Sequence, residues 1–106
     1  MRVELLYFDG CPSYPVAEER VRRVLRERGL DAHIEMVRVQ TDEEALRLGF
    51  PGSPTIRVDG RDLFPTEEQV EGALGCRIYA TPDGLTGAPT VGMIRQTLGR
   101  GVEAGT

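Results

Sequence analysis

The chain of 106 residues contains no tryptophan, no lysine and no asparagine, and it has only one histidine and two cysteines. The histidine is His33, and the cysteines are Cys11 and Cys76. These three side chains cannot supply the four ligands of a closed zinc site, so we expect no such metal site. Long apolar runs are also missing, since a membrane-spanning helix needs roughly 18 or more apolar residues in succession. We therefore expect no membrane partner.

The size and charge of the chain favour a single small domain that does not bind nucleic acid. Apolar residues make up 40% of the sequence, enough for one hydrophobic core, and the net charge is -4. Nucleic-acid-binding domains carry clustered basic residues. The one dense basic segment, Arg20–Arg28, is interleaved with Glu18, Glu19 and Glu27. At helical spacing this pattern predicts an exposed, ion-paired face.

The N-terminal segment does not look like a secretory signal. Its apolar run, Met1–Phe8, is interrupted by Glu4 and lacks an n-region and a small-residue cleavage site. We expect a cytoplasmic protein. Because the cytosol is reducing, we expect no permanent structural disulfide, which leaves Cys11 and Cys76 as reactive or buried thiols.

Hydrophobic periodicity predicts alternating strands and helices. The predicted strands of the main sheet are Val3–Phe8, His33–Val39, Thr55–Val58 and Arg61–Phe64. The predicted helices are Pro15–Arg28, Thr41–Leu48 and Pro89–Leu98. The Asp59-Gly60 pair between the last two strands is typical of a tight hairpin turn.

An insert separates the fourth strand from the last helix. We predict one or two helical turns over Thr66–Leu74, a strand over Cys76–Ala80 and a turn over Thr81–Gly84. After the last helix, residues 99–106 contain three glycines and are predicted to form a flexible tail. The domain is therefore expected to span residues 1–98.

The element order is β-α-β-α-β-β-α with the insert before the last helix, which predicts an α/β fold. Crossover connections between parallel strands are right-handed, and from this rule we predict that the first and third strands are parallel neighbours. Helices on both faces of the sheet would then complete a three-layer sandwich.

Cys11 is the first candidate functional residue because it lies between a strand and a helix. With Pro12 at the first helical position, Cys11 would lie near the N-cap, where free N–H groups and the helix dipole stabilise a thiolate. The thiolate is the reactive form of cysteine; the alternative is a small buried hydrophobic residue. Asp9 would repel a thiolate, and His33 is expected on the surface, far from Cys11.

Two segments resemble the thioredoxin-like superfamily. Gly10–Tyr14 (GCPSY) follows an apolar strand and opens a helix, in the place of that family's Cys-X-X-Cys motif. Gly52–Ile56 (GSPTI), followed by Val58–Gly60, is similar to the family's cis-proline segment and hairpin. The resemblance covers about residues 2–64 and the last helix.

This resemblance implies a thioredoxin-like sandwich in which Ser53-Pro54 is a cis peptide bond beside Cys11. It also implies that the backbone next to Pro54 binds an extended substrate segment. The substrate-binding residues expected on this basis are Pro12, Tyr14, Ser53, Pro54 and Thr55.

Tyr14 stands where the family has its second cysteine, so a local dithiol cannot form. We expect Tyr14 to shield the thiol of Cys11; the alternative is that its hydroxyl forms a hydrogen bond with the thiolate or with a bound oxyanion. Cys11 must then be resolved by glutathione, by another protein or by Cys76. Cys76 could approach Cys11 if the insert is compact, and a disulfide needs Cα atoms within roughly 7 Å of each other. The alternative is that Cys76 is an apolar strand residue beside Ile78.

Three functions are compatible with these residues. The first is a thiol-dependent oxidoreductase without a cofactor, acting through Cys11 on a protein or small-molecule disulfide, with Cys76 or glutathione as the resolving thiol. The second is a non-catalytic binding module that holds a peptide or protein partner near Pro54. The third is a protein that binds a soft metal ion or an organomercurial through both thiolates.

Overall fold

The computed structural model describes residues 1–30, 33–65 and 75–104, so the predicted helical turns at Thr66–Leu74 lie outside the described residues. Within these ranges a mixed sheet has the strand order β2-β1-β3-β4, formed by β1 (Val3–Tyr7), β2 (Ile34–Arg38), β3 (Thr55–Val58) and β4 (Arg61–Asp62). A separate hairpin consists of β5 (Tyr79–Thr81) and β6 (Gly84–Thr86). The helices are α1 (Tyr14–Glu27), α2 (Asp42–Leu48) and α3 (Val91–Ala104).

No helix in the described ranges has the length and apolarity needed to cross a membrane.

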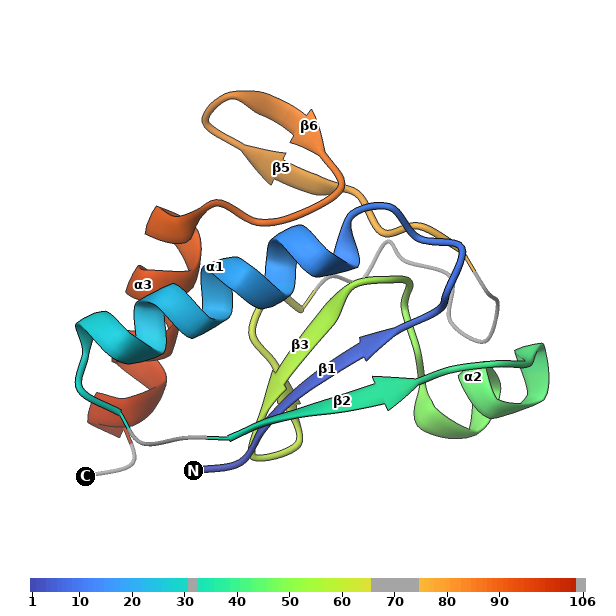
Figure 1. Ribbon diagram of the computed structural model, residues 1–106, viewed down its shortest axis with the longest axis horizontal. Coiled ribbons are helices and arrows are strands. Elements are labelled where there is room, and N and C mark those ends of the chain that lie inside the picture. The colour runs from blue at the N-terminus through green and yellow to red at the C-terminus, as the bar shows by residue number, and fades with distance from the viewer. Residues whose placement is uncertain (31–32, 66–74, 105–106) are drawn as a thin grey trace.

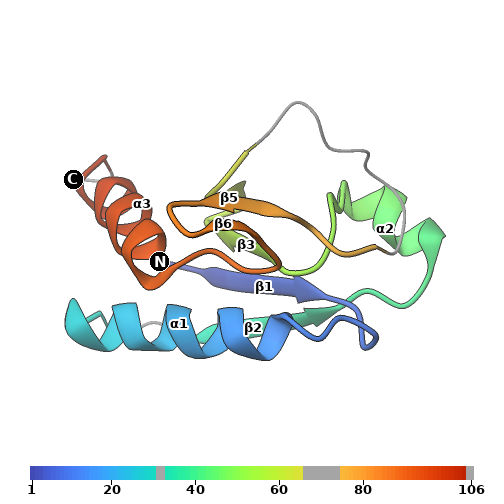
Figure 2. The same ribbon diagram turned by 90° about the horizontal axis from the view of Figure 1, so that it is seen from above.

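Helices cover both faces of the main sheet (Figure 1 and Figure 2). Successive residues of a strand face opposite sides of a sheet, so β1 contributes to two cores. Val3 and Leu5 pack with residues of α1 and α3, whereas Leu6 packs with Ala45 of α2. The predicted α/β fold with helices on both faces of the sheet is confirmed.

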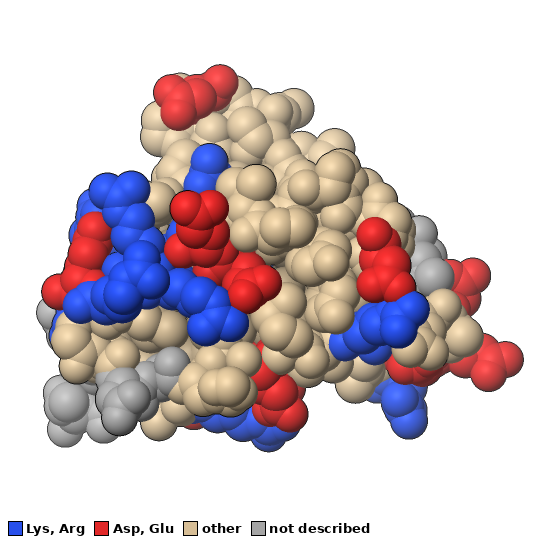
Figure 3. All heavy atoms as spheres, viewed as in Figure 1, with Lys and Arg blue, Asp and Glu red and all other residues tan. Residues whose placement is uncertain are grey.

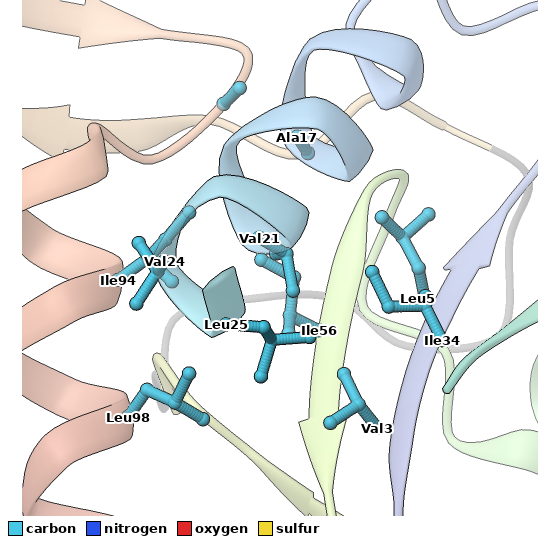
Figure 4. Close-up of a cluster of buried hydrophobic side chains, with 11 residues drawn as sticks. Val3, Leu5, Ala17, Val21, Val24, Leu25, Ile34, Ile56, Ile94 and Leu98 are labelled. Atoms are coloured by element: carbon cyan, nitrogen blue, oxygen red, sulfur yellow. The ribbon is translucent and has the colours of Figure 1, made fainter. Parts of the chain in front are cut away.

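The larger core lies between the sheet and helices α1 and α3 (Figure 4). Spacings of three and four residues place the apolar side chains of α1 on one helix face. The side chains of Ile94 and Leu98 in α3 point toward α1 and the sheet. The buried members of this core are Val3, Leu5, Ala17, Val21, Val24, Leu25, Ile34, Ile56, Ala88, Ile94 and Leu98.

The outer face of α1 carries charges of both signs (Figure 3). Glu18 pairs with Arg22 at 2.9 Å and Glu27 pairs with Arg23 at 3.3 Å, both at i,i+4 spacing. Arg95 of α3 also pairs with Glu27, at 2.8 Å. The predicted ion-paired face is confirmed, although exposed pairs of this kind contribute little to stability.

The direction of β3 differs from the prediction. β1 and β2 are parallel, but β1 and β3 are antiparallel, with Val3 opposite Val58 and Leu6 opposite Thr55. The seven residues of α2 form a helix only about 10 Å long, and it lies at the end of the sheet where β2 leaves (Figure 1). The chain therefore enters β3 from that same end, which makes β3 antiparallel to β1.

The predicted hairpin turn is confirmed, and a threonine side chain caps α2. Asp59 and Gly60 both have positive φ, 52° and 83°, as a two-residue hairpin turn requires. The side chain of Thr41 accepts a hydrogen bond from the N–H of Glu44 at 3.1 Å and caps α2. After the Asp59-Gly60 turn, β4 comprises only Arg61–Asp62 and is therefore shorter than the predicted strand Arg61–Phe64.

Three predicted boundaries are wrong. α3 continues to Ala104, so helical backbone occupies residues 99–104 where we predicted a tail. A glycine destabilises a helix by about 1 kcal/mol relative to alanine. Unlike proline it keeps the backbone N–H that the helix needs, so the glycines of this segment do not end the helix. The predicted strand at Cys76–Ala80 begins only at Tyr79, and Gly84–Thr86 is a strand that pairs with it.

Replacing Ile56 by alanine is expected to lower the free energy of unfolding by about 2–5 kcal/mol. Ile56 is fully buried in β3 and belongs to the larger core. Urea unfolding followed by circular dichroism measures the change. Leu85→Ala, at an exposed position on β6, is the control and should change stability by less than about 0.5 kcal/mol. Equal losses in the two variants would contradict this core.

Candidate functional site

Cys11 lies in the turn that connects β1 to α1. Its backbone N–H donates to the carbonyl of Phe8 at 3.1 Å, and the helix N-cap is Ser13. The prediction that Pro12 occupies the first helical position is therefore wrong, and Cys11 lies two residues before the cap. Pro15 occupies the first turn instead. Pro12 and Pro15 would both suit the start of a helix. The helix starts at the second of them because the residues before it form the tight turn after β1.

The thiol of Cys11 is buried and bound to the chain. Cys11 is only 3% exposed, and its Sγ donates a hydrogen bond to the carbonyl oxygen of Ser53 at 3.4 Å. The antiparallel pairing of β1 with β3 brings these residues together, because the end of β1 meets the start of β3. The Ser53-Pro54 peptide bond is cis, as the resemblance implies.

The backbone of Ser53 also pairs with the insert. Its N–H donates to the carbonyl of Gly75 at 2.8 Å, and its carbonyl accepts the N–H of Arg77 at 2.9 Å. These two bonds form a parallel β-bridge between Ser53 and Cys76. The carbonyl of Ser53 thus accepts hydrogen bonds from both Arg77 and Cys11.

This bridge places Cys76 beside Cys11. Burial, the negative charge of a Cys11 thiolate and a hydrogen bond with Cys11 together raise the pKa of Cys76 above its usual value, with burial the largest cause. Both cysteines are free thiols, Cys11 buried and Cys76 exposed. The pair that the sequence could only suggest is therefore brought together in the structure.

Arg77 anchors the segment that carries Cys76. Its side chain is buried and forms an ion pair with Asp62 at 2.8 Å and a hydrogen bond to Thr55 Oγ1 at 3.2 Å. It also donates to the carbonyl of Phe64. Arg77 was not among the predicted site residues, because the alternation of Cys76 and Ile78 with Arg77 predicts that the apolar side chains face inward and the arginine faces solvent, whereas Arg77 is the buried one.

Tyr79 is buried beside Arg77, and the two side chains form a buried layer beneath the insert. Its hydroxyl donates to the carbonyl of Pro54 at 2.5 Å, and the guanidinium of Arg77 lies 4.7 Å from the centre of its ring. Burial raises the pKa of Tyr79 well above its usual value, more than the charge of Arg77 lowers it. The hydroxyl therefore remains a donor at neutral pH. Arg77 and Tyr79 face inward, whereas Cys76 and Ile78 face solvent.

The expected substrate-binding residues do not form an open surface. Ser53, Pro54 and Thr55 are buried, and both backbone hydrogen-bonding groups of Ser53 are used within the chain. Pro12 is exposed. Tyr14 stacks on Tyr7 with ring centres 4.3 Å apart, and the described residues include no hydrogen bond between Tyr14 and Cys11. An extended substrate therefore finds no free backbone group at Ser53.

An open pocket of about 240 Å³ lies next to the turn that precedes Cys11. It is lined by Phe8, Asp9, Gly10, Arg38, Val39 and Gln40, at the carboxyl ends of β1 and β2. The predicted repulsion between Asp9 and a thiolate is offset, because Asp9 forms an ion pair with Arg38. The lining combines charged and polar side chains with Phe8 and Val39, and it includes neither cysteine.

His33 lies outside the site. It is exposed and precedes β2, and because β1 and β2 are parallel it lies at the end of the sheet opposite to Cys11. Within the described ranges, no group of three or more His, Cys, Asp or Glu side chains is placed to hold a metal ion.

Comparison with known proteins adds no further assignment. No protein-family model, curated protein or solved structure matches the chain.

Replacing Gly52 by alanine is expected to lower the free energy of unfolding by about 1–3 kcal/mol. Gly52 has φ +131°, and a Cβ there would lie 3.1 Å from the backbone nitrogen of Arg77. Hydrogen exchange at the Arg77 amide should speed up in the same variant. Gly75→Ala is the control, because a Cβ at Gly75 meets nothing within 4 Å. Equal effects of both substitutions would refute the close approach of these segments.

Replacing Cys11 by alanine is expected to lower the pKa of Cys76. The substitution removes the charge and the hydrogen bond that raise it and leaves only the effect of burial. The rate of Cys76 alkylation by iodoacetamide should therefore reach its midpoint at a lower pH, and should be faster at pH 7. Ile94→Val, a conservative change elsewhere in the core, should leave the midpoint unchanged. A midpoint that Cys11→Ala does not move would show that the thiols do not interact.

Proposed function

We propose that this protein is a thiol–disulfide oxidoreductase in which Cys11 and Cys76 alternate between dithiol and disulfide. The observation that carries this proposal is the β-bridge between Ser53 and Cys76 together with the hydrogen bond from Cys11 Sγ to the carbonyl of the same Ser53. Both cysteines are held around Ser53, one by its thiol and one by the backbone of its neighbours. A Cys11–Cys76 disulfide would therefore link two segments that already meet at Ser53.

The proposal includes a thioredoxin-like arrangement of the domain. The element order supports it, as does the position of Cys11 between β1 and α1 with Ser53-Pro54 beside it. Tyr14 occupies the place of the usual second cysteine. Cys76, which comes from the insert, would supply the second thiol instead.

The proposed reaction is an exchange of two electrons with a disulfide of a partner molecule. One protein thiolate attacks a partner sulfur, so that a mixed disulfide forms and one partner thiolate leaves. The other protein thiolate then attacks the protein sulfur of the mixed disulfide, and the second partner thiolate leaves. The partner disulfide becomes two thiols, which take up the protons of Cys11 and Cys76. An external thiol such as glutathione reverses the sequence.

The binding-module hypothesis is less well supported by the same geometry. A peptide that adds to a sheet edge needs free backbone N–H and C=O groups. At Ser53 both groups are bound to residues Gly75 and Arg77. A partner held at Pro54 would first have to displace the insert.

Binding of a soft ion is the second candidate, because it is favoured by the same pair of thiols. Soft metal ions prefer thiolate ligands. Cys11 and Cys76 would provide two thiolates at one site. The ion would then be the cargo of the protein. In this case replacement of either cysteine by serine should weaken binding of Cu(I), measured by competition with a chelator.

The exchange proposal is tested by intact mass and peptide mapping of the protein equilibrated in glutathione redox buffers. We expect the wild-type protein to lose two hydrogens, mapped to a Cys11–Cys76 disulfide. Cys76→Ser combined with Ala80→Cys is the matched control, since it moves the exposed thiol along the same segment and should form no internal disulfide. If both wild-type cysteines stay free in the most oxidising buffer, the proposal is wrong.

A further inference from the structure

We propose that Cys76 is the thiol that exchanges with the external partner and that Cys11 is the internal thiol that displaces the partner. This inference rests on the proposed function, and it reverses the roles expected from the sequence. It is carried by the difference in access between two thiols that lie side by side.

Access to Cys11 is blocked in the folded protein. An attack on a disulfide requires the sulfur to approach along the S–S axis, so the attacking thiolate must be exposed to its partner. Cys11 is 3% exposed and its Sγ is bound to the carbonyl of Ser53. It can meet an external disulfide only when the structure opens locally. The observed reaction rate of Cys11 is then the rate in the open state multiplied by the small fraction of molecules that are open.

Cys76 needs no such opening. It is exposed, and the alternation along its segment directs Arg77 inward while Cys76 and Ile78 face solvent. The two backbone bonds to Ser53 and the buried guanidinium of Arg77 hold Cys76 beside Cys11. The segment therefore presents its thiol to solvent on one side and to Cys11 on the other.

The steps follow from this placement. The Cys76 thiolate attacks one sulfur of a low-molecular-weight disulfide, a Cys76 mixed disulfide forms, and the first small thiolate leaves. The Cys11 thiolate then attacks Sγ of Cys76, the bond between Cys76 and the small molecule breaks, and the second small thiolate leaves. The small disulfide is reduced by two electrons, and the protons of both cysteines pass to the released thiolates.

The reverse reaction favours the same assignment. An external thiolate can reach only Sγ of Cys76 in the internal disulfide, and attack there expels Cys11. Access therefore directs the external thiolate to Cys76.

Rapid mixing with glutathione disulfide, followed by acid quenching and peptide mapping, tests these roles. In the wild type, the first mixed disulfide should map to Cys76. Cys11→Ser should react at least as fast as the wild type and retain one glutathione on Cys76. Cys76→Ser should react at least about tenfold more slowly, because Cys11 reacts only through local opening.

The outcomes separate this inference from the function on which it rests. If the wild-type intermediate maps to Cys11, or if Cys76→Ser reacts as fast as Cys11→Ser, the assignment of roles is wrong even though the internal disulfide still forms at equilibrium. If no internal disulfide forms at equilibrium, the proposed function itself fails. Mapping of the wild-type intermediate does not depend on the variants, so a variant that fails to fold does not prevent the test.

Discussion

The hydrogen bonds that converge on the backbone of Ser53 are the constraint on which the site depends. Its carbonyl accepts hydrogen bonds from the thiol of Cys11 and from the N–H of Arg77, and its own N–H donates to the carbonyl of Gly75. One residue thus joins the turn after β1, the start of β3 and the insert. Without these bonds the backbone of Cys76 would not be paired beside the residue that binds the Cys11 thiol, and a thiol couple would lose its structural basis.

The buried layer beneath the insert explains why this contact persists. A buried charge is costly unless it is paired, and Arg77 pairs with Asp62 while its guanidinium lies against Tyr79. Removal of one partner would leave the other buried and uncompensated. The segment is therefore held by its inward side chains, which leaves Cys76, directed outward, available for chemistry.

Local features of this chain could be predicted from its sequence, and long-range contacts could not. The Asp59-Gly60 turn depends on neighbouring residues alone, and it was predicted correctly. The direction of β3 depends on where α2 packs, which periodicity does not report. The pairing of Cys76 with Ser53 is made by backbone groups that every sequence has, so no residue type signalled it. Arg77 was missed because a charged residue in a strand is ordinarily exposed.

A redox titration followed by the ¹³Cβ chemical shifts of Cys11 and Cys76 would decide whether the two thiols act as one couple. If they do, both resonances change from reduced to oxidised values at a single midpoint potential, and the amide of Arg77 stays protected because the bridge to Ser53 is retained. Two separate midpoints, or a change at Cys76 alone, would show that the cysteines are independent thiols and that the site around Ser53 is only structural.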